Sequence, residues 1–104
     1  MVVDESAEAL SVLGREYTLQ ILEATDEPRS ARELHEELDI PMATCHRRLE
    51  ALSDLGFLDG KKKTRDRDKR NRTVYTRSVD EIKFDFENSA AMETHKIANG
   101  LPTR

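Results

Sequence analysis

The chain has 104 residues, of which 37% are hydrophobic, 37% are charged and only 5% are aromatic, and its formal net charge is −4. This length fits a single domain with a thin, aliphatic core and leaves little room for the cleft of a sizeable enzyme. No apolar run of about 18 residues predicts a membrane span, the acidic N-terminus is unlike a signal peptide, and the one cysteine excludes an internal disulfide. We therefore expect a soluble, cytoplasmic protein without membrane association.

Two helices are expected in the first 28 residues. The first runs from Asp4 to about Leu13, behind an acidic turn that suits the positive end of a helix. Gly14 interrupts it, and a second apolar helix runs from Arg15 to about Ala24. The polar residues 25–28 close that second helix.

The stretch 30–58 predicts two helices joined by a tight turn. Ser30 and Glu33 have the spacing of a capping box, so a helix is expected from about Ala31 to Leu38. Pro41 pushes the residue before it out of the α region and itself suits the start of the next helix. The spacing therefore predicts a helix-turn-helix.

The second helix of this pair has two different faces. Residues at helical spacing predict a buried stripe of Cys45, Leu49, Leu52 and Leu55. The opposite face carries Ala43, Thr44, His46, Arg47 and Glu50. That face suits the base edges of DNA, because arginine pairs bidentately with guanine and a methyl group can contact thymine. A plain solvated face is the alternative.

Cys45 is expected at a core position that needs a small apolar side chain. A redox switch is the alternative reading of Cys45, because its oxidation would disturb the packing of the helix.

A hairpin is expected after this helix. Gly56 predicts the helix end, and a strand follows it directly. The β-branched and aromatic residues 73–77 predict the returning strand. Nine basic and only two acidic residues lie between Lys61 and Arg77, and they are expected at the tip of the hairpin. A basic stripe on an acidic chain is a common means of binding phosphate.

The C-terminal part is expected to form a strand and then a short helix. Ile82, Phe84 and Phe86 alternate with charged residues, which is the period of a half-buried strand that extends the small sheet. Asn88 or Ser89 then caps a helix that ends near residue 99.

This order of elements resembles a winged-helix transcription regulator of the ArsR-type class, particularly the small versions typical of halophilic archaea. The resemblance covers roughly Leu10 to Thr76 and rests on LGREYTLQILEA, on SARELHEELDIPMATCHRRLEAL, and on LGFLDG with the basic stretch after it. It implies a mainly α fold with a small antiparallel sheet (α+β), a winged helix-turn-helix. One domain, 1–104, would then contain a helix-turn-helix at about 30–55, a wing at about 57–78, and a C-terminal strand and short helix at about 81–99.

The resemblance also implies which residues contact double-stranded DNA. The second helix would read the major groove with Met42, Ala43, Thr44, His46 and Arg47. The wing would contact the adjacent backbone or minor groove with Lys61, Lys62, Lys63, Arg65, Arg67, Lys69, Arg70 and Arg72. Metal-sensing members carry paired cysteines in the helix that corresponds to residues 31–38, and this chain has none there.

No metal, cofactor or enzymatic activity is expected, because the three histidines lack metal-ligand spacing and no phosphate loop or nucleophile motif occurs. A sequence-specific DNA-binding regulator is the leading prediction. A winged helix that binds proteins, or serves as an adaptor of the transcription machinery, is the alternative.

A homodimer is expected through apolar residues of the terminal segments, namely Leu10, Leu13, Met92 and Ile97. The alternative is a monomer whose C-terminal segment folds back on its own sheet, against Ile82, Phe84 and Phe86.

Overall fold

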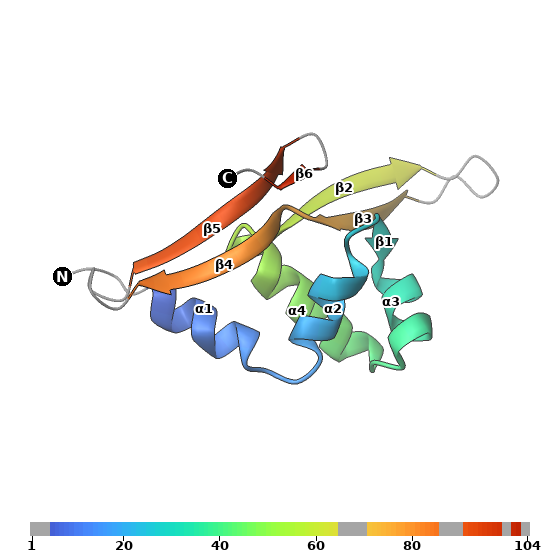
Figure 1. The fold of residues 1–104 in the computed structure, drawn as a ribbon. Helices are drawn as coiled ribbons and strands as arrows, with labels where there is room; N and C mark the ends of the chain where they lie inside the picture. Colours follow the sequence, from blue (N-terminus) through green and yellow to red (C-terminus); the bar gives the residue numbers. More distant parts are fainter. Residues whose placement is uncertain (1–4, 65–70, 86–90, 99–100, 103–104) are drawn as a thin grey trace.

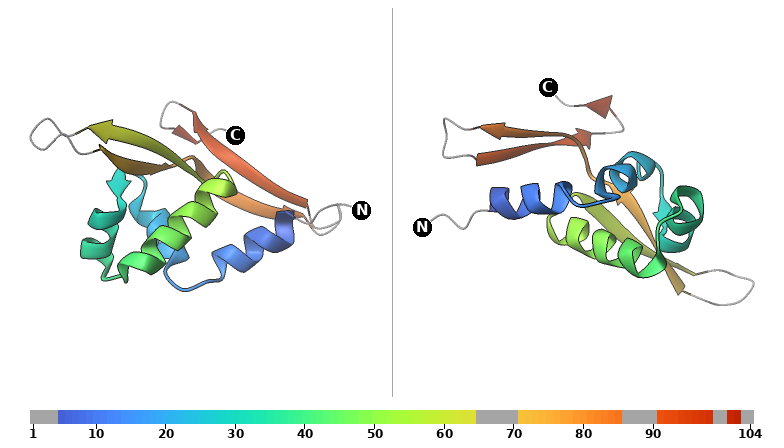
Figure 2. Two further views of the ribbon diagram at one scale, coloured as in Figure 1. Left: turned by 180° about the vertical axis from the view of Figure 1, so that it is seen from behind. Right: turned by 90° about the horizontal axis from the view of Figure 1, so that it is seen from below.

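A computed structural model describes residues 5–64, 71–85, 91–98 and 101–102, with side chains for 7–63 and 72–84. Its helices are α1 (Glu5–Leu13), α2 (Thr18–Ala24), α3 (Ala31–Leu38) and α4 (Met42–Asp54). Its strands are β1 (Arg29–Ser30), β2 (Leu58–Thr64), β3 (Asn71–Arg77), β4 (Val79–Asp85), β5 (Ala91–Ala98) and β6 (Leu101–Pro102). The four helices lie on one side of the strands β2 to β5 (Figure 1; Figure 2).

The first two helices occur where the sequence predicts them, but α2 begins three residues later than expected. Tyr17 adopts a left-handed conformation with φ 73°, so it precedes the helix and does not belong to it. The chain between α1 and α2 therefore forms a turn, in which the Gly14 amide donates to the Leu10 carbonyl at 3.0 Å. Ala9 and Val12 of α1 are buried in the core together with Ile21 and Leu22 of α2.

The predicted capping box at the start of α3 is confirmed. The Ser30 amide donates to Glu33 Oε1 at 2.9 Å, and the Glu33 amide donates to Ser30 Oγ at 3.2 Å. Asp39 takes a left-handed φ of 55° and turns the chain toward α4, which begins directly after Pro41. Local side chains thus specify where both helices begin.

Gly56 ends α4 as predicted. Its φ is 82°, its amide donates to the Ser53 carbonyl at 3.0 Å, and the Phe57 amide donates to the Leu52 carbonyl at 2.9 Å. These two bonds form a Schellman motif, which leaves Phe57 buried and lets β2 begin at the next residue.

The first sheet has the order β1-β3-β2 and is antiparallel. The hairpin of β2 and β3 was predicted, but its strands extend further than expected, because Leu58 pairs with Arg77 and the ladder continues to Thr64 and Asn71. Lys61, Lys62 and Lys63 therefore lie on β2, whereas the sequence placed them at the tip.

Two predictions for the C-terminal part are wrong. β4 does not extend the first sheet, since it pairs with β5 in a second antiparallel sheet of order β4-β5-β6. The expected short helix is a strand, β5, whose register pairs Phe84 with Met92 and Ile82 with Thr94. The backbone groups of β4 need a partner ladder, and this requirement outweighs the helical preference of the alanines and methionine. The hairpin of β4 and β5 lies beside α1 (Figure 1).

A single aliphatic cluster holds the helices against the strands. Its largest fully buried side chains lie on α2, on α3 and α4, and on the residues that follow α3 and α4. They are Ile21, Leu34, Ile40, Leu49, Leu52 and Phe57. Four helices, a helix-turn-helix and a hairpin that follows it make the fold an α+β winged helix, as predicted.

Candidate nucleic-acid interface

The outer face of α4 carries the residues that were predicted to read bases. Ala43, His46 and Arg47 are exposed, Met42 is 38% exposed, and Thr44 is half-buried. Arg47 Nη2 donates to Thr44 Oγ1 at 3.1 Å. The predicted exposure is therefore confirmed for Met42, Ala43, His46 and Arg47, whereas Thr44 is half-buried and its hydroxyl is bonded to Arg47.

The inner face of α4 is the predicted buried stripe. Cys45, Leu49 and Leu52 are fully buried, while Leu55 is half-buried. Cys45 Sγ donates to the Ala31 carbonyl at 3.5 Å, which joins α4 to the first turn of α3. Burial raises the pKa of the Cys45 thiol. Because the thiolate is the reactive form, these surroundings favour the core role of Cys45 and oppose the redox alternative.

Two polar contacts that hold α4 in place were not found from the sequence. His35 Nδ1 hydrogen-bonds the Ile40 carbonyl and so closes the turn between α3 and α4. Arg48 Nε donates to the Glu16 carbonyl at 3.0 Å, which fastens α4 to the turn between α1 and α2. The first contact spans only five residues, but nothing in the sequence pairs Arg48 with residue 16, 32 positions away.

The described part of the wing presents lysines on both faces of β2. Lys61, Lys62 and Lys63 are exposed, and no described carboxylate forms an ion pair with any of them. Directly paired residues share a face of the sheet. Lys62, paired with Thr73, therefore lies on one face, and Lys63, paired with Arg72, lies on the other. The predicted contacts Arg65, Arg67, Lys69 and Arg70 lie outside the described residues.

Among the described wing residues, Arg72 has an ion-pair partner. Its Nη1 lies 3.9 Å from Glu33 Oε1 in the first turn of α3, and both side chains are more than a third exposed. Arg77, at the base of the same strand, donates through Nη1 to the Leu22 carbonyl at 2.9 Å. That contact belongs to the fold, since it satisfies a carbonyl in the last turn of α2.

Tyr75 connects the wing to α4. A Cβ on Gly60, its ladder partner, would lie 3.2 Å from the Tyr75 ring, so the glycine lets the ring cover β2 closely. Tyr75 packs against the core, and burial, followed by the nearby Cys45 and Glu50, raises the pKa of its hydroxyl. The base of the wing thus packs against α4.

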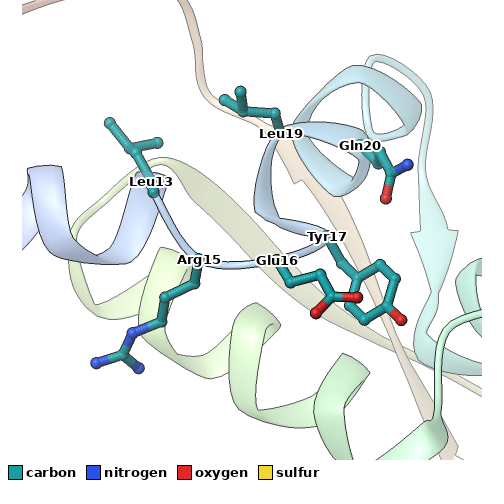
Figure 3. Close-up of a pocket in the computed structure, with 7 residues that line it drawn as sticks. Leu13, Arg15, Glu16, Tyr17, Leu19 and Gln20 are labelled. Carbon is teal, nitrogen blue, oxygen red and sulfur yellow. The ribbon is translucent and has the colours of Figure 1, made fainter.

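A shallow hollow of about 420 Å³ lies at the turn between α1 and α2 (Figure 3). Leu13 and Leu19 project to one side of it, whereas Arg15, Glu16 and Tyr17 lie on the other. A hydrogen bond to the Glu16 carboxylate raises the pKa of Tyr17. The searched side chains contain no cluster of three potential metal ligands.

The predicted dimer residues are only partly described. Leu10 of α1 is 50% exposed, whereas Leu13 is half-buried and packs against the core. Met92 and Ile97 lie on β5, and their side chains are outside the described part. Since β5 pairs with β4, the C-terminal segment does fold back on a strand of its own chain.

Together, the fold and the exposed face of α4 define a winged helix-turn-helix protein, a class that places its second helix in the major groove of DNA. Residues 13–61 match a family model described as a helix-turn-helix domain. The matched region runs from the end of α1 to β2, and the match supports a DNA-binding regulator. No curated protein matches the chain. No described helix is long and apolar enough to cross a membrane.

Proposed function

We propose that the protein is a non-enzymatic regulator that binds double-stranded DNA sequence-specifically, with α4 in the major groove and the wing on the adjacent backbone or minor groove. The observation that carries this proposal is the juxtaposition of two exposed features. Arg47 and its neighbours project from α4, and the exposed lysines of β2 follow shortly after the same helix. Bases would be read by the first feature and phosphates would be neutralised by the second.

The assignment to the ArsR-type class and to a halophilic archaeon belongs to this proposal. The acidic composition outside the wing supports the second part, since a net charge of −4 coexists with nine basic residues in one short stretch. If the protein is adapted to high salt, its free energy of unfolding rises between low salt and molar potassium chloride.

Base reading is tested with Arg47→Ala. A duplex that the wild type prefers is first selected from random sequences, and affinities for this duplex and for random DNA are then compared. The substitution should weaken binding to the selected duplex by about 1–3 kcal/mol and change binding to random DNA little. Arg32→Ala removes an exposed, ion-paired arginine of α3 and serves as the control for charge. Equal losses on both duplexes would contradict the role of Arg47.

Phosphate contact by the wing is tested through salt dependence. Each phosphate neutralised contributes about −0.9 to the slope of log affinity against log salt concentration. Replacement of Lys61, Lys62 and Lys63 with glutamine should make that slope shallower and leave sequence preference unchanged. Lys83→Gln, on the hairpin of β4 and β5, removes the same type of charge away from the wing. An unchanged slope in the triple variant would exclude these three lysines as phosphate contacts.

The alternative function, a winged helix that binds proteins or serves as an adaptor of the transcription machinery, predicts weak or no affinity for DNA and no duplex that the selection enriches. The lysines of β2 argue against it, because a protein partner needs such a charge only if that partner is acidic.

The proposed regulator is a homodimer, so its operator is an inverted repeat of half-sites about one helical turn apart, or a multiple of it. The expected seam consists of Leu10 and Leu13 of α1 with Met92 and Ile97 of β5. Sedimentation at micromolar concentration should show twice the chain mass, and Leu10→Asp or Ile97→Asp should shift it toward the monomer and weaken operator binding. A wild-type monomer in both low and high salt would contradict the dimer and the symmetric operator.

A further inference from the structure

Two cations face each other on the wing. Lys63 of β2 is the ladder partner of Arg72 of β3, so their side chains start from the same face of the hairpin. Like charges in directly opposed positions repel each other. Only the pair of Thr64 and Asn71 lies further along the described ladder. The arrangement costs stability unless an anion lies close by.

Glu33 supplies such an anion in the free protein. Its Oε1 atom accepts the Ser30 amide of the capping box at 2.9 Å and lies 3.9 Å from Arg72 Nη1. The Ser30 amide is the main cause of the lowered pKa of this carboxyl, and Arg72 and Arg29 lower it further. Glu33 is therefore held charged at neutral pH, beside the wing.

The ion pair between Glu33 and Arg72 involves only one nitrogen of the guanidinium group, Nη1. At 3.9 Å the contact is a long ion pair, and no described acceptor bonds the buried Nε–H of Arg72. The Arg72 side chain is 37% exposed, so its terminal nitrogens remain open to a phosphate, which guanidinium groups bind through two N–H donors.

We propose that Lys63 and Arg72 together bind one phosphate of the DNA backbone, and that Glu33 occupies Arg72 until that phosphate replaces it. This inference rests on the proposed function, because it assumes that the wing meets DNA. Glu33 would then weaken binding to every duplex by the same factor and leave sequence preference unchanged, because a phosphate contact carries no sequence information.

The test uses Glu33→Gln in the full chain. Glutamine retains an oxygen for the capping box but removes the charge that competes for Arg72. Affinity for a labelled random-sequence duplex should rise about two- to fivefold, the range that corresponds to an exposed ion pair. Glu36→Gln is the matched control, since Glu36 is also an ion-paired glutamate of α3 but contacts Arg32 and not the wing. Ser30→Ala controls for loss of the cap.

Combining Glu33→Gln with a second substitution shows which wing residue is responsible for the gain in affinity. The gain from Glu33→Gln should vanish when Arg72 is replaced with glutamine, and it should persist with Lys62→Gln, because Lys62 lies on the opposite face of the hairpin. Without DNA, urea unfolding of the single and double variants at positions 33 and 72 should show a favourable coupling between the two residues.

Several results would overturn the inference. These are a gain in Glu33→Gln no larger than in Glu36→Gln, a gain that survives Arg72→Gln, no coupling in urea, or a loss of affinity in Glu33→Gln, which would mean that Glu33 positions Arg72 for DNA. Failure of the proposed function is distinguished from these outcomes, because there the wild type itself would bind no duplex.

Discussion

Gly56 offers a sharp test of how the chain passes from α4 into the wing. Its φ of 82° lies in the left-handed region, and a Cβ at this position would have no atom within 4 Å. The cost of Gly56→Ala is therefore backbone strain alone, about 1–2 kcal/mol in the free energy of unfolding. Gly56→Asn should cost less, because asparagine tolerates this conformation better than alanine does.

The measurement is urea unfolding without DNA. With a slope of about 2 kcal/mol/M, the loss in Gly56→Ala corresponds to a midpoint lower by about 0.5–1 M. Gly60 is the control, because a substitution there is opposed by lack of space and not by backbone conformation. Its φ is not left-handed, and a Cβ there would lie 3.2 Å from the Tyr75 ring and 3.3 Å from the Thr73 methyl group.

The alanine and asparagine variants should therefore rank in opposite order of stability at the two glycine positions. At residue 56, asparagine should be better tolerated than alanine, because conformation decides. At residue 60, alanine should be better tolerated than asparagine, because space decides. The same order at both positions, or a Gly56→Ala protein as stable as the wild type, would refute the reasoning.

Three further outcomes are expected. His35→Ala should lower the free energy of unfolding by about 1–3 kcal/mol, since it leaves the Ile40 carbonyl without its donor, and His35→Gln should recover part of the loss in the same urea assay. Cys45→Ala should cost about 1 kcal/mol, and the native thiol should be alkylated far more slowly than the unfolded one; equal rates would restore the redox alternative. The lowered pKa of Glu33 means that its carboxylate stabilises the fold above the usual carboxyl range, and this contribution is lost as pH falls through the folded pKa. Stability should thus decline less steeply below about pH 5 in Glu33→Gln, and parallel pH curves would contradict this.

Features that depend on neighbouring residues were predictable from the amino-acid sequence. Ser30 and Glu33 start α3 because a hydroxyl and a carboxylate three residues apart satisfy each other's amides. Gly56 ends α4 because it adopts a positive φ without a steric cost. The two faces of α4 follow from the helical period alone, so the exposed candidate residues near Arg47 were predictable.

Features that join distant parts of the chain depend on tertiary packing and were not predictable. The segment 91–98 contains residues that suit a helix, yet it forms β5 because β4 requires a partner for its backbone. The same holds for the contact of Arg48 with residue 16 and for that of Arg72 with Glu33, which connect elements far apart in the sequence. No local pattern records such pairs, because they arise when the core brings the helices and the hairpin together, and that packing decides which charges of the wing are free and which are already paired.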